Sequence, residues 1–356
     1  MKISDIKQIT DNFVNELREA EAGKQTSLPY IEHTLASPVI VNNESFQVLV
    51  IGGSVYQTAT CIFQDGKLVI QKRTNGDKPT FNTKEDLLTF VDSQYEPSID
   101  VLAINFAYPL QPVTDDTCLD GVLTHAVKEN AFTGLIGEPI GKVIAQFIKS
   151  KHKKDVKISV ANDTICTLLS GLHLHKPEEL ACGIVGTGVN FAYFKDELHP
   201  VNLESGNFDK FPQSTYGNIV DQYSVTPGQG LFEKEISGAY LYQHFNKYAE
   251  EHGLQDRVMS TKELDMFAKT CNGSGICTFT QNLLDNAAAY VAAQVAGITL
   301  VKQRDMSFVM AGSIFWKAWT VRESVERIIQ ELVPQHRVTF MPIENCEIYG
   351  AAKLVG

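Results

Sequence analysis

The spacing of apolar residues predicts an amphipathic helix at the start of the chain. Its apolar positions recur every three or four residues: Ile3, Ile6, Ile9, Phe13 and Leu17. Residues 46–73 instead form two β-rich runs. Gly52-Gly53-Ser54 interrupts the first of them. Asp65-Gly66 has the composition of a tight hairpin turn, so it predicts a strand on each side.

The rest of the first half alternates helices and strands. The pattern predicts helices over 84–95 and 137–151, an apolar strand over 99–112 that ends at Pro109, a short extended piece at 120–124, and a strand over 155–162.

The second half repeats this plan. Residues 180–198 read as a strand, a glycine-rich turn, a strand and a charged turn, much like residues 46–67. Helices are expected at about 231–250, 261–269, 278–302 and 319–333, strands at 306–313 and 336–342, and the start of a short helix at 350–356. Strand pairs joined by glycine turns, each followed by alternating elements, predict two related α/β domains facing each other.

Composition narrows the class of protein. The 356 residues are 44% hydrophobic and carry 31 Lys and Arg against 42 Asp and Glu, a net charge of −11. This balance does not favour a nucleic-acid surface. The seven scattered cysteines fit reduced, buried thiols in a cytoplasmic protein, and a metal site at Cys271 and Cys277 is not expected. Residues 287–301 are too short and alanine-rich for a membrane span, so we expect a buried helix.

One polar pair has two interpretations. The apolar strand in "KISVANDTICTLLSGL" ends at Asn162-Asp163 and turns directly into a helix. Asn and Asp are good helix N-caps, because their side-chain oxygens accept a free backbone N–H. A carboxylate at the carboxyl end of a strand is also where open α/β sheets place catalytic groups.

Motifs along nearly the whole chain resemble the hexokinase family, the sugar kinases of the actin-like ATPase superfamily. In chain order they are "TSLPYIEHTL", "VLVIGGSVYQTA", "NFAYPLQP", "DGVLTHAVKENAFTGLIGEPI", "VANDTICTLLSG", "GIVGTGVNFAY", "VNLESGNFDKF", "DQYSVTPGQGLFEKEISGAYL" and "FVMAGSIFW". The resemblance implies two actin-like, ribonuclease-H-like α/β domains flanking a central cleft. We predict a small domain at 45–158 and a large domain from 1–44 and 159–356.

The resemblance also implies ATP-dependent phosphorylation of a hexose, with glucose the leading substrate. A sugar kinase must hold a hydroxyl in line with the γ-phosphate and remove its proton. Asp163 matches the family's general base, and it is expected to touch the sugar as well. The other implied sugar contacts are Lys128, Asn162, Asn190, Glu204 and Glu233. For Glu204, Glu233 and Lys128 the alternative is ordinary surface charge.

The nucleotide and Mg²⁺ are the implied cofactors. Phosphates require backbone N–H groups and small residues that permit close approach. Both glycine-rich turns qualify, and the turn after the strand at 306–313 resembles the adenosine-binding turn. The implied nucleotide-binding residues are Gly52, Gly53, Ser54, Gly186, Thr187, Gly188, Gly312 and Ser313.

The first phosphate loop departs from the family pattern. Val50 replaces the Asp that reaches magnesium through water, and Val55 and Gln57 replace the loop's later Asn and Arg. Ala107 and Val127 replace a Ser and a Thr, and "NCEIYGAA" lacks glycines of the corresponding family stretch. Loss of the magnesium-orienting carboxylate and of the phosphate-side Arg removes roughly 2–4 kcal/mol of positioning and charge stabilisation.

Two hypotheses follow. The first is a hexose kinase with Asp163 as base, acting on glucose or on fructose, mannose or an amino sugar. The second is a catalytically impaired sugar sensor or regulatory protein. Asp163 favours the kinase, because a binder needs no base, whereas Val50 and Gln57 favour the sensor. Neither the phosphoryl donor nor the oligomeric state follows from the sequence.

Overall fold

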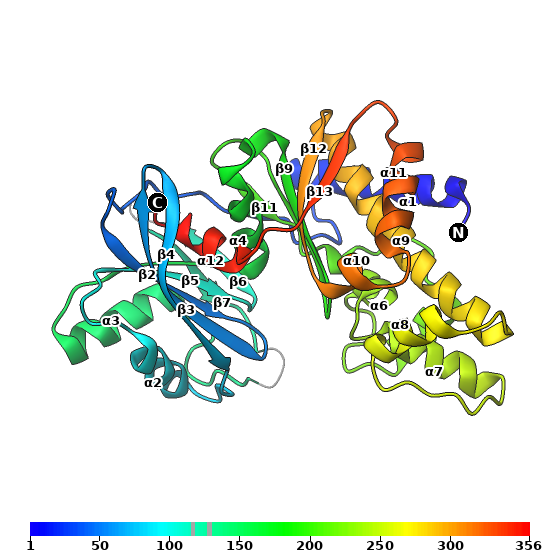
Figure 1. Ribbon diagram of the computed structural model, residues 1–356, viewed down its shortest axis with the longest axis horizontal. Coiled ribbons are helices and arrows are strands. Elements are labelled where there is room, and N and C mark those ends of the chain that lie inside the picture. The colour runs from blue at the N-terminus through cyan, green and yellow to red at the C-terminus, as the bar shows by residue number, and fades with distance from the viewer. Residues whose placement is uncertain (115–117, 127–129) are drawn as a thin grey trace. The chain divides into compact units, whose positions relative to one another are not determined.

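The computed structural model describes residues 1–114, 118–126 and 130–356. Packing divides the chain into two compact units, each a mixture of helices and strands (Figure 1). Unit 1 comprises residues 1–30, 181–193 and 203–342, and unit 2 comprises 31–180, 194–202 and 343–356. The predicted domain boundaries, which place 45–158 in a small domain, stay a prediction.

Unit 2 is built on a five-stranded sheet with the order β4-β3-β2-β5-β8. Its elements are β1 (Ile31–Glu32), β2 (Ser45–Ile51), β3 (Val55–Gln64), β4 (Lys67–Asp77), α2 (Lys84–Gln94), β5 (Val101–Phe106), β6 (Leu110–Thr114), β7 (Leu119–Leu123), α3 (Ile140–His152), β8 (Lys157–Ala161), α4 (Asp163–Ser170), β11 (Pro200–Asn202) and α12 (Cys346–Ala352). Strands β2, β5 and β8 run parallel, whereas β3 and β4 run antiparallel to their neighbours.

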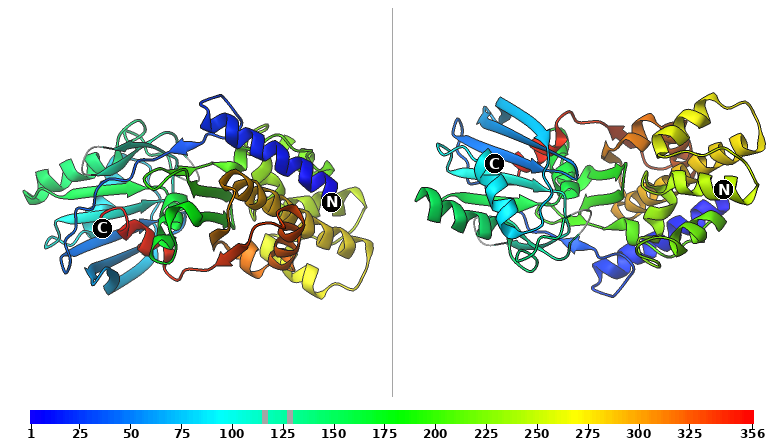
Figure 2. Two further views of the ribbon diagram at one scale, coloured as in Figure 1. Left: turned by 90° about the horizontal axis from the view of Figure 1, so that it is seen from above. Right: turned by 90° about the horizontal axis from the view of Figure 1, so that it is seen from below.

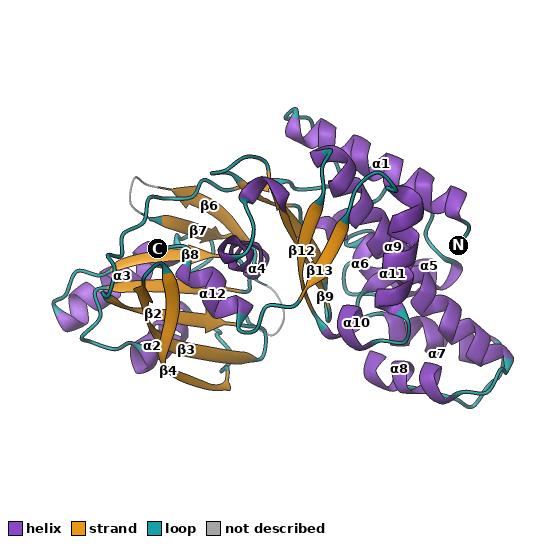
Figure 3. Ribbon diagram, turned by 45° about the horizontal axis from the view of Figure 1, so that its top comes forward, coloured by secondary structure: helices purple, strands orange, loops and turns teal. Residues whose placement is uncertain are grey.

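Both faces of this sheet are covered. Leu49, Ile51 and Ile104 belong to the buried cluster that also contains the apolar side of α2 and α3. On the other face, α12 packs against β2, β5 and α4, as the secondary-structure colouring of Figure 3 shows. The predicted hairpin turn is confirmed: Asp65 and Gly66 both have positive φ, 51° and 74°, as in a two-residue type I′ turn.

Unit 1 contains the strands β9 (Leu180–Val185), β10 (Val189–Phe194), β12 (Met306–Ala311) and β13 (Val338–Met341). Its helices are α1 (Ile3–Glu21), α5 (Thr215–Gln222), α6 (Leu231–Ile236), α7 (Leu241–Glu251), α8 (Thr261–Thr270), α9 (Gly275–Lys302), α10 (Ser313–Lys317) and α11 (Val321–Leu332). β9 pairs antiparallel with β10, and β12 pairs parallel with β13.

The central helix of unit 1 is α9, as its alanine-rich sequence predicts. An 18-residue window of α9 has the length and composition to cross a membrane, but 78% of that window is buried within the chain. Helices α1 and α11 pack along it, and α1 is the blue helix of Figure 2. Phe13 of α1 meets α9 at Gly297, where an added Cβ would lie 2.5 Å from the ring. This burial is that of a core helix.

Two expectations are corrected. The predicted helix over 231–250 is two helices, α6 and α7, because the chain breaks at Ser237-Gly238 to hydrogen-bond another loop. The cysteines are not all reduced thiols: Cys271 and Cys277 form a disulfide between the end of α8 and the start of α9. The intervening glycine-rich loop brings their Cα atoms to 5.6 Å.

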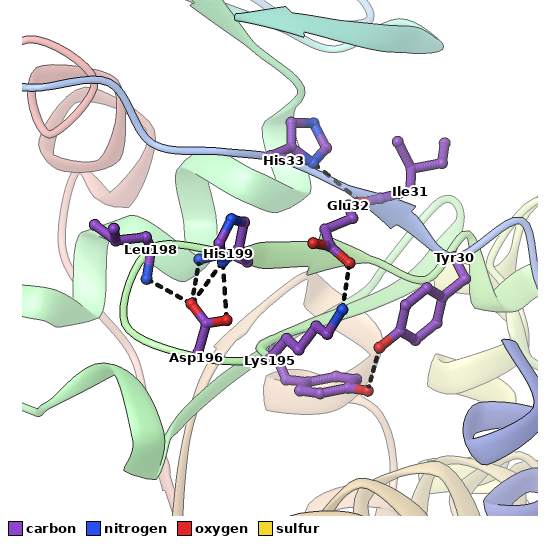
Figure 4. Close-up of polar contacts among 9 residues, drawn as sticks. Tyr30, Ile31, Glu32, His33, Lys195, Asp196, Leu198 and His199 are labelled. Carbon is purple, nitrogen blue, oxygen red and sulfur yellow. Dashed lines mark hydrogen bonds and ion pairs between the residues drawn. The ribbon is translucent and has the colours of Figure 1, made fainter. Parts of the chain in front are cut away.

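The segment after α1 is held by short polar contacts (Figure 4). The Tyr30 and Tyr193 hydroxyls lie 3.1 Å apart in unit 1. In unit 2, Lys195 forms a 2.9 Å ion pair with Glu32 of β1, and β1 pairs antiparallel with β11. Asp196 accepts hydrogen bonds from the backbone N–H groups of Leu198 and His199. The pairing with β11 and the ion pair of Glu32 hold Ile31–Glu32 as a short strand.

Helix α6 contains a buried charged side chain, Lys234. The Lys234 ammonium, in a side chain that is 1% exposed, donates to Asp221 at 2.5 Å and to the Thr226 carbonyl at 2.7 Å. His244, which is fully buried, lies 2.8 Å from the Lys234 carbonyl through Nε2. Its Nδ1 has no hydrogen-bond partner among the described residues. Burial lowers the pKa of His244 to about 4.

Replacing Gly350 with alanine should destabilise unit 2. A Cβ at this position would overlap the Cys166 carbonyl, so α4 and α12 would have to separate, at a cost of about 1–3 kcal/mol. Denaturant unfolding of Gly350→Ala measures this. The matched control is Gly275→Ala at the start of α9, where the nearest atom to an added Cβ lies 3.8 Å away. Equal stability of the two variants would contradict the packing described here.

Acid should destabilise the fold through His244. Because its folded pKa of about 4 lies below the ordinary 6.5, stability is complete above 6.5 and is lost as the pH falls toward 4. The loss at pH 4.5 is about 2–3 kcal/mol. His244→Gln keeps a donor for the Lys234 carbonyl but does not titrate, so its stability should fall less between pH 7 and 4.5. Exposed His252→Gln is the control, and should follow the wild type.

Candidate functional site

In unit 2, three chain segments meet at the carboxyl edge of the parallel strands. Register pairs Val50 of β2 with Asn105 of β5, and Asn105 with Ala161 of β8. The predicted phosphate loop, the segment at Ala107 and the Asn162-Asp163 pair therefore follow at the same edge. The Ala107 N–H donates to the Ile51 carbonyl at 3.0 Å, which joins the first two segments directly.

The Asn162-Asp163 pair begins helix α4. Asn162 is the N-cap, and its Oδ1 accepts the Thr164 N–H at 2.8 Å, so the capping interpretation is confirmed for Asn162. Asp163 is the first helical residue, and its Oδ1 accepts the same N–H at 2.8 Å. Asn162 is buried, whereas the Asp163 side chain is half-buried. The carboxylate thus lies at a helix N-terminus, where the helix dipole stabilises negative charge.

The first glycine turn is tight. The Gly52 N–H donates to the Val55 carbonyl at 3.0 Å, and a Cβ on Gly52 would lie 2.8 Å from that oxygen. Gly53 and Ser54 are exposed at the tip. Val50 is 5% exposed and pairs in register with Gln57. These two of the departures from the family pattern therefore lie on one face of the sheet.

In unit 1, the three predicted sugar-binding residues are gathered by hydrogen bonds. Asn190 of β10 accepts the Ser205 N–H through Oδ1 at 3.2 Å, which places it beside Glu204. Glu233, in the first turn of α6, accepts the Val189 N–H at 3.1 Å. A Cβ on Gly188 would lie 3.0 Å from the same Glu233 oxygen. The Asn190 amide, the Glu233 carboxylate and the backbone at Glu204 therefore lie around the start of β10.

The backbone at Glu204 is unusual for a residue with a side chain, because its φ is 48°. The next residue, Ser205, is hydrogen-bonded to a side chain of the core. Ser205 donates to Gln294 Oε1 at 3.1 Å, and Gln294 Nε2 donates to the Ser205 carbonyl at 3.2 Å. Gln294 is fully buried in α9. Sequence analysis missed this positioning residue, although a glutamine within an alanine-rich apolar helix was a usable signal.

The two predicted nucleotide segments of unit 1 are adjacent. The Gly186 N–H donates to the Gly188 carbonyl at 3.0 Å, which closes the turn around exposed Thr187. A Cβ on Gly186 would lie 3.2 Å from the Gly312 Cα. Gly312 has a φ of 99°, and a Cβ there would overlap the Val185 carbonyl. Ser313 follows as the exposed first residue of α10.

The chain after α6 is pinned to the same turn. The Gly238 N–H donates to the Gly186 carbonyl at 2.7 Å, and the Ala239 N–H donates to the Thr187 carbonyl at 3.1 Å. These bonds account for the break between α6 and α7. Lys128, the remaining predicted sugar contact, lies outside the described residues, as does Val127.

Comparison with known proteins identifies relatives. A protein-family model described as hexokinase matches residues 181–247, which include the glycine turn, Asn190, Glu204 and Glu233. The hexokinase of Emericella nidulans is 26% identical over 275 residues, which cover 67% of this chain and 55% of that protein. Hexokinase-1 of Oryza sativa subsp. japonica is 32% identical over 158 residues, which cover 39% of this chain and 31% of that protein. The matches thus span about half or less of these relatives' length.

Solved structures show the same fold. The structure of the Schistosoma mansoni hexokinase complexed with glucose superposes with a TM-score of 0.78 at 18% identity, covering 100% of this chain and 95% of that one. The ROK hexokinase of Thermus thermophilus gives a TM-score of 0.60 at 15% identity, covering 87% of this chain and 97% of that one. Together, these matches identify the chain as a relative of the hexokinases that shares the two-domain fold of their solved structures.

Proposed function

We propose that this chain transfers a phosphoryl group from ATP to the 6-hydroxyl of a hexose, with glucose as the leading substrate. The observation that supports this best is the cluster of Asn190, Glu204 and Glu233 beside the glycine turn at 186–188. A kinase needs a group that recognises sugar hydroxyls next to one that admits phosphate. We assign these two tasks to the cluster and to the glycine turn, which lie next to each other at the start of β10.

The amide and carboxylates suit a sugar because hydroxyls both donate and accept hydrogen bonds. Carboxylate oxygens accept strongly from hydroxyls, and the Asn190 amide can also donate. The Val189 N–H fixes the Glu233 carboxylate, and the Ser205 N–H fixes the Asn190 oxygen. This hydrogen bonding orients the groups before a sugar arrives, which lowers the entropy cost of binding.

Asp163 is the proposed proton acceptor. A general base must be ionised at neutral pH and must reach the reacting hydroxyl. The Thr164 N–H and the start of α4 both favour the ionised carboxylate. Asn162 takes the capping role of this helix, so Asp163 is not required for it.

The residues of each glycine turn fit a nucleotide. At Gly52, Gly186 and Gly312 a Cβ would crowd neighbouring backbone, so these turns keep their tight shape only with glycine. Turns without side chains let phosphate oxygens approach backbone N–H groups. Bound Mg²⁺ would neutralise charge on the transferred phosphate. Among the described residues no group of three or more acidic, histidine or cysteine side chains could hold a metal alone. Asp163, the one acid of the predicted set in unit 2, would therefore act together with phosphate oxygens.

A second function is favoured by the first loop. Val50 is apolar and buried where the family has a magnesium-orienting carboxylate, and Gln57 is neutral where the family has an arginine. A protein that senses or regulates through bound sugar needs neither group. Glucose binding without ADP release would support that function over the kinase.

Asp163→Asn should abolish ADP release. The amide keeps the size of the side chain but accepts no proton, so kcat should fall by about 10²–10⁴-fold. A coupled ADP-release assay with MgATP and a panel of glucose, fructose, mannose and amino sugars measures this. Asp155→Asn, at the amino end of β8 with a side chain 82% exposed, is the control and should keep the wild-type rate. Unchanged turnover in Asp163→Asn would rule out its role as base.

Glu233→Gln should weaken sugar binding whether or not the chain turns over. Loss of a charge-assisted hydrogen bond to a sugar hydroxyl corresponds to an increase of roughly 10–100-fold in Kd. Calorimetric titration with glucose measures the affinity, and Glu250→Gln on the exposed surface of α7 is the matched control. If both variants bind glucose like the wild type, the cluster in unit 1 is not the sugar site.

A further inference from the structure

The neutral residue Gln57 in the first phosphate loop region contacts a cation from the next strand. Arg73 of β4 donates through Nη2 to Gln57 Oε1 at 2.7 Å. It also donates through Nη1 to Oδ1 of Asn345, the residue that precedes α12. Gln57 and Asn345 lie in two of the stretches where the sequence departs from the family. The guanidinium therefore connects the stretch around Gln57 with the stretch that begins at Asn345.

The register of the strands determines on which face of the sheet Arg73 lies. In the antiparallel pair of β3 and β4, Gln57 lies opposite Asn75 and Ala59 opposite Arg73. Gln57 also lies opposite Val50 of β2. Directly opposed residues share a face, and alternate residues along a strand do too. Arg73 thus lies on the same face as Val50 and Gln57. The three strands are adjacent in Figure 3.

The charge of Arg73 is not neutralised within the described part of the chain. Arg73 forms no ion pair there, and both of its acceptors are neutral amides. A guanidinium has five N–H donors, so two amide contacts orient it and leave donors for a further acceptor. The residue is exposed, so a ligand can reach it.

We propose that Arg73 binds a phosphate group of the phosphoryl donor at the turn formed by Gly52, Gly53 and Ser54. The inference rests on the proposed function for the identity of the donor. A planar guanidinium binds phosphate oxygens in a forked geometry, and the turn that precedes β3 can add backbone N–H groups. Cation and turn belong to one continuous hairpin, because β3 begins at Val55 directly after the turn.

The alternative role for Arg73 is protection of a sheet edge. β4 is the edge strand of its sheet, and charged side chains on edge strands oppose pairing with other chains. Such a role predicts effects on self-association but none on phosphate affinity. Lys72 separates the two roles. It carries the same charge and is exposed on the same strand. It pairs in register with Thr60, so it lies on the other face of the sheet from Arg73.

The test is calorimetric binding of inorganic tripolyphosphate and of ADP, without sugar, at fixed low salt. Arg73→Ala should raise Kd by about tenfold or more, as expected for loss of a charge-assisted phosphate contact. Lys72→Ala should change Kd by less than about twofold, because exposed charges on the far face are screened. Arg73→Lys keeps the charge without the fork, so its Kd should lie between those of Arg73→Ala and wild type. Thermal unfolding confirms that each variant is folded.

A second variant tests the position rather than the charge alone. Adding Gln57→Arg to Arg73→Ala returns a guanidinium to the same face, so it should recover most of the lost affinity. Equal affinities for Arg73→Ala, Lys72→Ala and wild type would overturn the inference, as would a wild type that binds neither probe. ADP release with glucose tests the proposed function separately. Binding that depends on Arg73 in a chain without turnover would support this inference and refute the kinase.

Discussion

Close approach of backbone segments at glycine is the constraint on which both units depend. In unit 2, α12 lies against α4 because Gly350 leaves room for the Cys166 carbonyl. In unit 1, Gly312 leaves room for the Val185 carbonyl, and Gly238 donates to the Gly186 carbonyl at 2.7 Å. A side chain at Gly312 or Gly238 would force apart the segments around the turn at 186–188, and one at Gly350 would force α12 away from α4. The same kind of contact therefore fixes the turn in unit 1 and the helix packing in unit 2.

Elements that depend on local spacing are predicted better from the sequence than elements that depend on distant contacts. Elements defined by local spacing were predicted closely, including the helix that begins at Ile3 and the hairpin at Asp65-Gly66. Elements defined by distant partners were not. The single helix expected over 231–250 breaks because Gly238 bonds a loop some fifty residues earlier in the chain. The disulfide between Cys271 and Cys277 depends on how α8 meets α9, which local spacing does not specify.

The candidate site divides in the same way. Asn162 and Asp163 could be found because a strand that turns directly into a helix is a local pattern. Asn190, Glu204 and Glu233 were found only through family resemblance, and the structure then joins them by bonds from Ser205 and Val189. Gln294 was missed because its role requires knowing which loop lies above the middle of α9. The sequence marks Gln294 as a polar residue in an apolar helix, but it does not specify the loop that Gln294 contacts.

The contact between Arg73 and Gln57 changes how the degenerate first loop should be interpreted. Along the chain, Val50, Gln57 and the stretch that begins at Asn345 are separate departures from the family pattern, and Val50 and Gln57 favour the sensor over the kinase. Across the sheet, Gln57 and Asn345 are both acceptors for one guanidinium, on the face that also contains Val50. Neutral amides at both positions suit an arginine between them, whereas a second arginine at 57 would repel it. The three side chains therefore form one hydrogen-bonded arrangement, in which the cation lies on β4 and both of its acceptors are neutral. Val50 is apolar, so it adds no acid to this face.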